Sequence, residues 1–318
     1  MHDSSIKYNI VIDTSLYKPY IAIVFVLFII LTSSLTSLNN TVSLAEGQQQ
    51  QSANNGNTKN VTELSKLNVN NSSITLENKT VNYFENTNGY LVYPISTTTS
   101  SSIKSNFSAN NNNTLPAVVM IHEWWGLNDN IKNMAETLAK EGYVVLAVDL
   151  YNGKVANTAE SAQNLVSKVR DNPSESINNL QHAVRYVASL ENVNSSKIAS
   201  LGWCFGGGQS LQLALNTEQE YPLAATIIYY GNLVSDQESI SKIKWPVLGI
   251  FGDQDQSISV QSVKQFEDAL NKNGITNEIY IYKGVGHAFA NPSGDNYAPQ
   301  ETQDAWQKTV SFLNKYLK

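Results

Sequence analysis

The chain has 318 residues, of which 42% are hydrophobic and 15% are charged. This balance predicts one sizeable folded domain with a polar appendage and excludes a chain that is disordered throughout. The formal net charge is -6 at pH 7 and Lys and Arg form no run, so the clustered positive charge that nucleic acids require is missing and we expect no nucleic-acid partner.

The N-terminus has a pattern typical of export. Two lysines precede an apolar run over residues 21–31, and Ser43 and Ala45 further on suit a signal peptidase. The run is shorter than the roughly 20 residues of a spanning helix, although residues 32–38 extend it to about that length. We therefore predict that residues 1–45 are either a cleaved signal peptide or a retained membrane anchor. In both cases the rest of the chain is expected outside the cytoplasm, secreted or held at the membrane.

Residues 46–79 are rich in Asn, Ser, Thr and Gln and carry too few apolar side chains to offset the entropy of ordering a chain. We predict a disordered linker here, and a long surface loop in a second polar tract over residues 96–114. Triplets of the Asn-x-Ser/Thr kind are acceptors for glycosylation, although a chain of this composition also forms them by chance. They begin at Asn39, Asn60, Asn70, Asn71, Asn78, Asn106, Asn112 and Asn194.

Strand and helix patterns alternate through residues 80–318, which we expect to form the folded domain. Short apolar runs rich in β-branched residues predict strands over 89–94, 116–122, 143–150, 197–203, 224–231, 246–252 and 277–284. Apolar residues at helical spacing predict helices over 131–138, 177–187, 263–270 and 306–317, with one more from residue 206 and a helical linker before 246. This alternation predicts an α/β fold with a mostly parallel, doubly wound sheet and helices on both faces. Functional groups then belong on the loops after the strands.

The only cysteine, Cys204, lies where a predicted strand turns directly into a helix, in the sequence GWCFGG. A single cysteine excludes an intramolecular disulfide and a multi-cysteine zinc site. Its frame, Gly202-x-Cys204-x-Gly206, is that of a nucleophile elbow with Cys in place of Ser. The helix N-terminus favours a thiolate, and the N–H of Phe205 would supply half of an oxyanion hole. The alternative is a small buried core residue, which is the common fate of a lone cysteine.

A histidine and an acid follow in the order expected of an α/β-hydrolase. His287 lies on a glycine-flanked loop after the last predicted strand, where a general base would be placed. The alternative is a structural histidine whose ring nitrogens only make hydrogen bonds within the fold. The sequence GDQD after the strand over 246–252 offers Asp253 and Asp255. Asp253 suits a turn, so we prefer Asp255 as the acid that orients the imidazole. The order Cys204, Asp255, His287 is the order of the α/β-hydrolase triad.

The sequence IHEWWGLN ends the strand over 116–122 and brings further groups to the same sheet edge. Glu123 would hold or remove the proton of the thiol, or else is an ordinary loop charge. The N–H of Trp124 is available as the second oxyanion donor. His122 has no second metal ligand at a motif spacing, so we expect no metal and no other cofactor.

Five motifs in register, HEWWGLN, DLY, GWCFGGG, GDQD and GHAFA, resemble the dienelactone hydrolase family of α/β-hydrolases from about residue 80 to the C-terminus. The resemblance implies that Cys204 is the nucleophile, His287 the base, Asp255 its orienting acid and Glu123 the group that deprotonates the thiol. It implies that an enol-lactone or ester carbonyl is attacked, an acyl thioester forms and water releases the acid.

The chain also departs from the family. Members that open dienelactones hold the substrate carboxylate with an Arg and a Tyr on the helix after DLY, and our alignment places Ser161 and Leu165 there, with Arg170 too far along to substitute. Ser259 replaces a proline after the acid. Family membership therefore predicts the reaction better than the substrate. The aromatic residues near the elbow predict a substrate with an apolar or aromatic acyl or alkoxy group, the alternative being that these side chains only fill the core. They are Trp124, Trp125, Trp203 and Phe205.

The sequence as a whole predicts an exported, cysteine-dependent hydrolase of lactones or small carboxylic esters, whose partner is the small-molecule substrate. We expect the protein to contact the membrane only if its N-terminal segment is not cleaved, and the sequence predicts no oligomeric state. Two alternatives remain: a surface-displayed binding domain that kept the fold and lost activity, and a thioesterase or general carboxylesterase without lactone preference.

Overall fold

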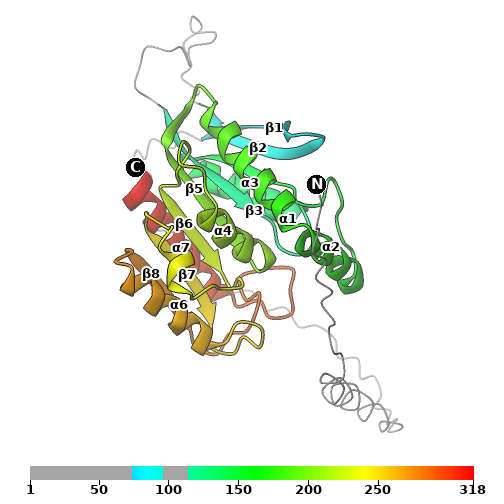
Figure 1. Cartoon of the computed structure of the whole chain (residues 1–318). Helices are drawn as coiled ribbons and strands as arrows, with labels where there is room; N and C mark the ends of the chain where they lie inside the picture. The colour runs from blue at the N-terminus through cyan, green and yellow to red at the C-terminus, as the bar shows by residue number, and fades with distance from the viewer. Residues whose placement is uncertain (1–73, 96–113) are drawn as a thin grey trace, which may run out of the picture. The chain divides into compact units, whose positions relative to one another are not determined.

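The computed structural model describes residues 74–95 and 114–318 (Figure 1). Within them, eight strands form one sheet in the order β1-β2-β4-β3-β5-β6-β7-β8. The first pairs, β1 with β2 and β2 with β4, are antiparallel, and every later pair is parallel. The strands are β1 (Thr75–Phe84), β2 (Thr87–Ile95), β3 (Leu115–Ile121), β4 (Val144–Val148), β5 (Val193–Trp203), β6 (Ala225–Tyr229), β7 (Val247–Gly252) and β8 (Asn277–Tyr282).

The helices cover both faces of the sheet, because alternate residues of each buried strand point to opposite sides. In β3, Val119 and Ile121 belong to one buried cluster, and Val118 and Met120 belong to the other. The first cluster takes side chains from α3, α4 and α6, and the second from α1 and α7. The helices are α1 (Asp129–Lys140), α2 (Ala159–Asp171), α3 (Pro173–Ala188), α4 (Phe205–Leu215), α5 (Gln237–Ile240), α6 (Val260–Lys272) and α7 (Pro299–Leu317). The predicted mostly parallel α/β sheet with helices on both faces is confirmed.

Strand β1 was not among the predicted elements. It begins at Thr75, inside the end of the expected linker 46–79, and is mostly exposed up to Thr80. Only Val81, Tyr83 and Phe84 are buried, because the strand lies at the edge of the sheet and pairs with β2 alone. A polar edge strand with so few inward side chains lacks the apolar run that marks a buried strand. The folded domain therefore starts before residue 80.

Several predictions fall on residues outside the described ranges and stay predictions. These are the signal or anchor over residues 1–45, export, the linker up to residue 73 and nearly all of the loop over 96–114. Of the glycosylation acceptors, Asn78 is exposed on β1 and Asn194 is half-buried in β5. Among the residues that the structure describes, no helix is both long and apolar enough to cross a membrane.

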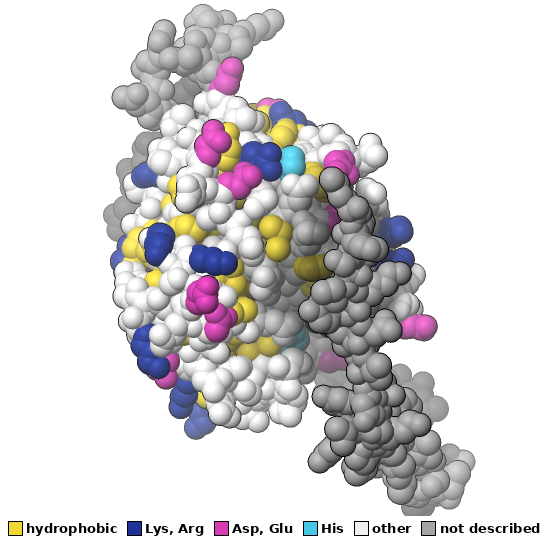
Figure 2. Space-filling view, in the orientation of Figure 1, with side chains coloured by type: hydrophobic (Ala, Val, Ile, Leu, Met, Phe, Trp, Pro, Cys, Tyr) yellow, Lys and Arg dark blue, Asp and Glu magenta, His cyan; other side chains and the backbone are white. Residues whose placement is uncertain are grey.

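Charged side chains are dispersed over the domain. On the face of the described residues seen in Figure 2, Lys and Arg lie among Asp and Glu and form no continuous basic patch. Most ion pairs of the described residues are local or exposed, such as Lys308 with Asp304 on α7. Exposed pairs of this kind contribute little to stability. The sheet and its two apolar clusters therefore hold the loops that follow the strands.

Candidate active site

Cys204 stands at a strained turn between β5 and α4. Its φ is 55° and its ψ is -117°, a region that a side chain rarely adopts. Glycines on either side allow the backbone to pack directly against backbone at this turn. A Cβ on Gly206 would lie 2.4 Å from the carbonyl oxygens of Ile121 and His122. A Cβ on Gly202 would lie 2.1 Å from the carbonyl oxygen of Gly206. The glycine frame thus holds the half-buried thiol above the sheet at the N-terminus of α4.

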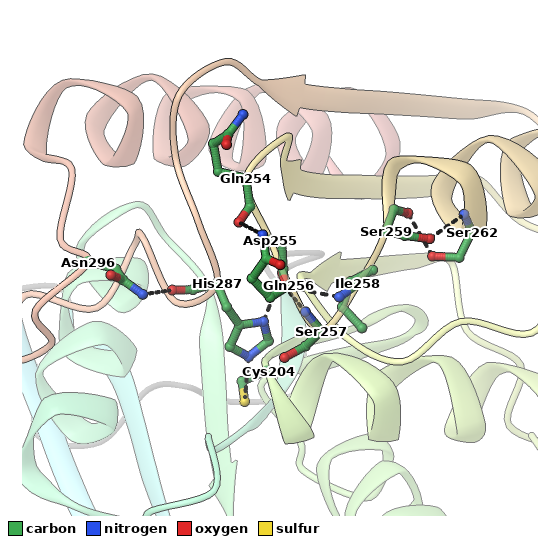
Figure 3. Close-up of polar contacts among 10 residues, drawn as sticks. All are labelled: Cys204, Gln254, Asp255, Gln256, Ser257, Ile258, Ser259, Ser262, His287 and Asn296. Atoms are coloured by element: carbon green, nitrogen blue, oxygen red, sulfur yellow. Dashed lines mark hydrogen bonds and ion pairs between the residues drawn. The ribbon is translucent and has the colours of Figure 1, made fainter. Parts of the chain in front are cut away.

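His287 reaches the thiol from the loop between β8 and α7. Its Nε2 lies 3.1 Å from Cys204 Sγ, and its Nδ1 lies 2.8 Å from Asp255 Oδ2 (Figure 3). Asn296 donates a hydrogen bond to the carbonyl of His287, and the ring of Tyr230 meets the imidazole edge-on. Ala288 and Tyr230 have positive φ, as Cys204 does. Three strained residues at one place are typical of a functional site.

The acid that contacts His287 is Asp255, as we preferred from the sequence. Its buried carboxylate also accepts hydrogen bonds from the backbone N–H groups of Ser257 and Ile258, at 2.7 and 2.9 Å. Asp253 instead accepts the N–H of Gly284 at 2.6 Å and closes a turn. Ser259, at the position where the resemblance led us to expect a proline, caps α6 by accepting the N–H of Ser262.

The contacts among Cys204, His287 and Asp255 stabilise the charged forms of the imidazole and of the carboxylate. Burial lowers the pKa of His287, but the hydrogen bonds to Asp255 and Cys204 outweigh it and raise this pKa to about 10. Burial would raise the pKa of Asp255, but the hydrogen bonds from His287 and from the backbone lower it. The site therefore favours an imidazolium beside an ionised carboxylate at neutral pH.

Glu123 lies at the end of β3 on the same cavity and is only 4% exposed. Burial raises the pKa of Glu123 to about 7, against the opposing effects of His287 and of a hydrogen bond from Asn291. That bond, from Asn291 Nδ2 to Glu123 Oε2, measures 2.6 Å. Among the described residues, Asn291 is the one hydrogen-bond partner of the Glu123 carboxylate. The Cys204 thiol contacts His287 and not Glu123. Asn291 was not among the predicted site residues, although it follows His287 by four residues in HAFAN.

The two expected oxyanion donors are available. Among the described residues, the backbone N–H groups of Trp124 and Phe205 donate no hydrogen bond. Both residues line the cavity that contains Cys204. Phe205 opens α4, so its N–H belongs to the helix end that attracts negative charge.

His122 is a structural residue. It is fully buried, its Nδ1 lies 2.6 Å from the carbonyl oxygen of Glu123, and its Nε2 accepts the N–H of Leu150 at 3.1 Å. Burial lowers its pKa, so the ring is neutral, with Nδ1 donating. With both nitrogens engaged, His122 links the ends of β3 and β4. No three His, Cys, Asp or Glu side chains of the described residues are grouped as metal ligands.

The cavity around the thiol has a volume of about 480 Å³. Trp124 and Trp125 line it as expected, with their ring centroids 4.9 Å apart. Trp203 does not, and our expectation for it is wrong. It is 1% exposed and packs on Tyr229, on the face of the sheet that α1 and α7 cover, because Trp203 and Leu201 lie on the same side of β5.

The side chains of α2 that reach this cavity also differ from those we expected. Ser161 completes the capping box of α2 with Thr158, and Leu165 lines a different cavity, beside Phe84. Gln163, Val166 and Arg170 line the cavity of Cys204 instead. We expected Arg170 to lie too far along the helix, but residues 163, 166 and 170 all line this cavity, because they stand at the i, i+3, i+7 spacing of one helix face.

Comparisons with known proteins agree with these features. Residues 105–317 match the model of the dienelactone hydrolase family. The chain is 34% identical over 247 residues to "Putative carboxymethylenebutenolidase" of Saccharolobus solfataricus, covering 67% of this chain and 94% of that protein. It is 31% identical to "Protein usf" of Aquifex pyrophilus, over 64% of this chain and 89% of that one. The crystal structure of a "Putative Dienelactone Hydrolase" of Klebsiella pneumoniae superposes with a TM-score of 0.63 at 25% identity, covering 77% of this chain and all of that one.

Proposed function

We propose that this chain, which belongs to the dienelactone hydrolase family, hydrolyses lactones or small carboxylic esters through an acyl thioester on Cys204. One observation carries the proposal: His287 lies within hydrogen-bond distance of both Cys204 Sγ, at 3.1 Å, and Asp255 Oδ2, at 2.8 Å. Nucleophile, base and orienting acid in this geometry are the requirements of covalent acyl transfer. A binding domain without activity would need none of these contacts.

The first half of the reaction forms the thioester. The Cys204 thiolate, paired with the His287 imidazolium, attacks the carbonyl carbon, and a C–S bond forms as the carbonyl electrons move to oxygen. The N–H groups of Trp124 and Phe205 stabilise the resulting oxyanion. When the oxyanion collapses, the C–O bond to the leaving group breaks and His287 gives it the proton. In a lactone the leaving oxygen stays attached to the acyl chain as an enol or alcohol.

The second half consumes one water molecule. The now neutral His287 takes a proton from water, whose oxygen attacks the thioester carbon, and collapse of this second oxyanion releases the carboxylic acid and the Cys204 thiolate. Asp255 holds the imidazole by Nδ1 throughout. Glu123, buried on the same cavity as Cys204, takes the proton of any Cys204 that is still a thiol before the substrate is attacked. The sum is one ester bond and one water converted to an acid and an alcohol.

Mass spectrometry of peptides from the acid-quenched protein tests this function directly. Full-length protein is mixed with p-nitrophenyl acetate or an enol lactone, quenched in acid within one turnover, and digested. We expect an added acyl mass on the peptide that contains Cys204, together with steady release of product. Turnover of both substrates without any adduct on that peptide would contradict the covalent route, and no turnover of either by folded protein would contradict hydrolysis of this substrate class.

Arg170 is expected to select for substrates that carry a negative charge. It is exposed at the cavity and makes no ion pair with the described residues, so a substrate carboxylate can pair with its guanidinium. We expect Arg170→Gln to lower kcat/KM for a carboxylated enol lactone about tenfold, a modest effect because the site is open to water. The rate with neutral p-nitrophenyl acetate should not change.

Lys168→Gln is the matched control for Arg170→Gln. Lys168 is an exposed cation on the same helix, but it lines the cavity beside Phe84. It should leave both substrates unaffected. Equal losses in the two variants would mean that only net charge matters, and no loss in either would remove Arg170 from substrate selection.

A further inference from the structure

The buried carboxylate of Glu123 is held by a partner that carries no charge. Asn291, itself only 7% exposed, donates the amide hydrogen bond of 2.6 Å to Glu123 Oε2. No Lys or Arg of the described residues forms an ion pair with Glu123. A carboxylate removed from water needs a donor or a cation to remain ionised. Asn291 is the neutral donor in this position.

The surrounding chain fixes which end of the amide points to Glu123. Asn291 Oδ1 accepts the backbone N–H of Ser293 at 2.8 Å, so the opposite end, which carries the two N–H groups, faces the carboxylate. The backbone N–H of Asn291 donates to the carbonyl of Ala288 in the same turn. The short segment from His287 to Asn291 therefore brings the imidazole to the thiol and the amide to the carboxylate.

The other groups that act on Glu123 come from the loop of Asn291 itself and from three further parts of the chain: the end of β6, the elbow and α2. His287 on the loop after β8 favours its ionised form. Tyr230 after β6 and Cys204 at the elbow line the same cavity, and like charge on either would disfavour that form. Arg170 of α2 and Asp295, on the loop before α7, lie on the cavity wall with opposite charges. None of these groups donates a hydrogen bond to the carboxylate in the structure, whereas Asn291 does.

We propose that Asn291 is a positioning residue for Glu123: its amide holds the carboxylate beside the elbow in its ionised form and so sets the lower pH limit of activity. The inference rests on the proposed function, in which Glu123 accepts a proton from the thiol. Without the donor, burial acts on the carboxyl unopposed by this bond, and the protonated form persists to higher pH. One lost hydrogen bond to a charged group corresponds to about one pH unit or somewhat more.

The pH dependence of kcat/KM in full-length protein tests the role of Asn291. We expect Asn291→Ala to move the acid limb of the profile upward by about one pH unit. Asn296→Ala is the matched control, because Asn296 supports the same loop through the carbonyl of His287 but does not touch Glu123. It should lower the rate without moving the acid limb. Equal movement in both variants, or none in Asn291→Ala, would overturn the inference.

A second variant at the same position tests the inference if Asn291→Ala does not fold. Asn291→Leu removes the amide donor but keeps most of the side-chain volume, so the acid limb should move in the same direction as in Asn291→Ala. An unmoved limb in this folded variant would contradict the inference as well.

Infrared spectroscopy separates this inference from the proposed function. The C=O stretch of the protonated Glu123 carboxyl is followed against pH in Cys204→Ala protein, which needs no activity, and is identified by its absence in Cys204→Ala with Glu123→Gln. Adding Asn291→Ala should raise the pH at which the band disappears. An unshifted band in a protein whose activity depends on Cys204 would refute the role of Asn291 alone, whereas activity independent of Cys204 would refute the proposed function.

Discussion

Cys204→Ala should lower kcat for ester and lactone hydrolysis by about 10⁴-fold or more, because no other described side chain stands beside His287 as a nucleophile. The residual rate would come from the oxyanion donors and from substrate binding. Steady-state kinetics on p-nitrophenyl acetate and an enol lactone, under reducing conditions, measure the loss. Circular dichroism and the thermal midpoint should match those of the parent, since alanine adds no atom to the turn.

Cys204→Ser is the control that separates nucleophilicity from shape. The hydroxyl keeps the position and the contact with His287 but is a far weaker nucleophile than a thiolate. We expect a slow enzyme, intermediate between the parent and Cys204→Ala. Parent-like activity in the folded alanine variant would remove the thiol from the mechanism.

Asp255→Asn should lower kcat by about 10⁴-fold, the size of loss seen when the acid of a Ser-His-Asp triad becomes an amide. The carboxylate holds His287 by Nδ1 and stabilises the imidazolium, and an amide does the second poorly and favours the wrong tautomer. The pKa of His287, now about 10 because Asp255 and Cys204 stabilise its charged form, should fall. NMR titration of the imidazole and kcat measure the two effects.

Asp253→Asn tests whether the effect is specific to Asp255. Asp253 lies two residues away in the same sequence and accepts the N–H of Gly284, with no contact to His287. Asn accepts the same hydrogen bond, so kcat and the His287 titration should stay close to those of the parent. A comparable loss in both variants would mean that the loop, and not the carboxylate on His287, is required.

The framework of the site could be predicted from the sequence because each part has a local signature. Buried parallel strands are continuous apolar runs, and helices have a regular apolar spacing, so the order of elements follows from periodicity. The parallel strands bring their carboxyl ends to one edge, which places Cys204, Asp255 and His287 together once the order of elements is known. Glycines around Cys204 mark the strained turn by themselves.

The remaining features depend on side-chain direction, which the sequence does not encode locally. Whether Trp203 faces the cavity or the opposite cluster depends on the register of β5. Arg170 reaches the cavity because of how α2 lies on the domain, not because of its distance from DLY. The contact between Asn291 and Glu123 joins residues 168 positions apart. Strand β1 lacked an apolar run because it lies at an edge.

Because the elbow holds the single sulfhydryl of the chain, labelling of this thiol can be used to titrate the active sites in a sample. Cys204 is the only cysteine in 318 residues, it is half-buried at the cavity, and it lies against an imidazole that stabilises negative charge on sulfur. A chromogenic disulfide or an iodoacetamide dye will therefore label one atom per chain. The fraction of protein labelled then equals the fraction of intact sites, so turnover can be expressed per working site in any preparation, and substrate that occupies the cavity should slow the labelling.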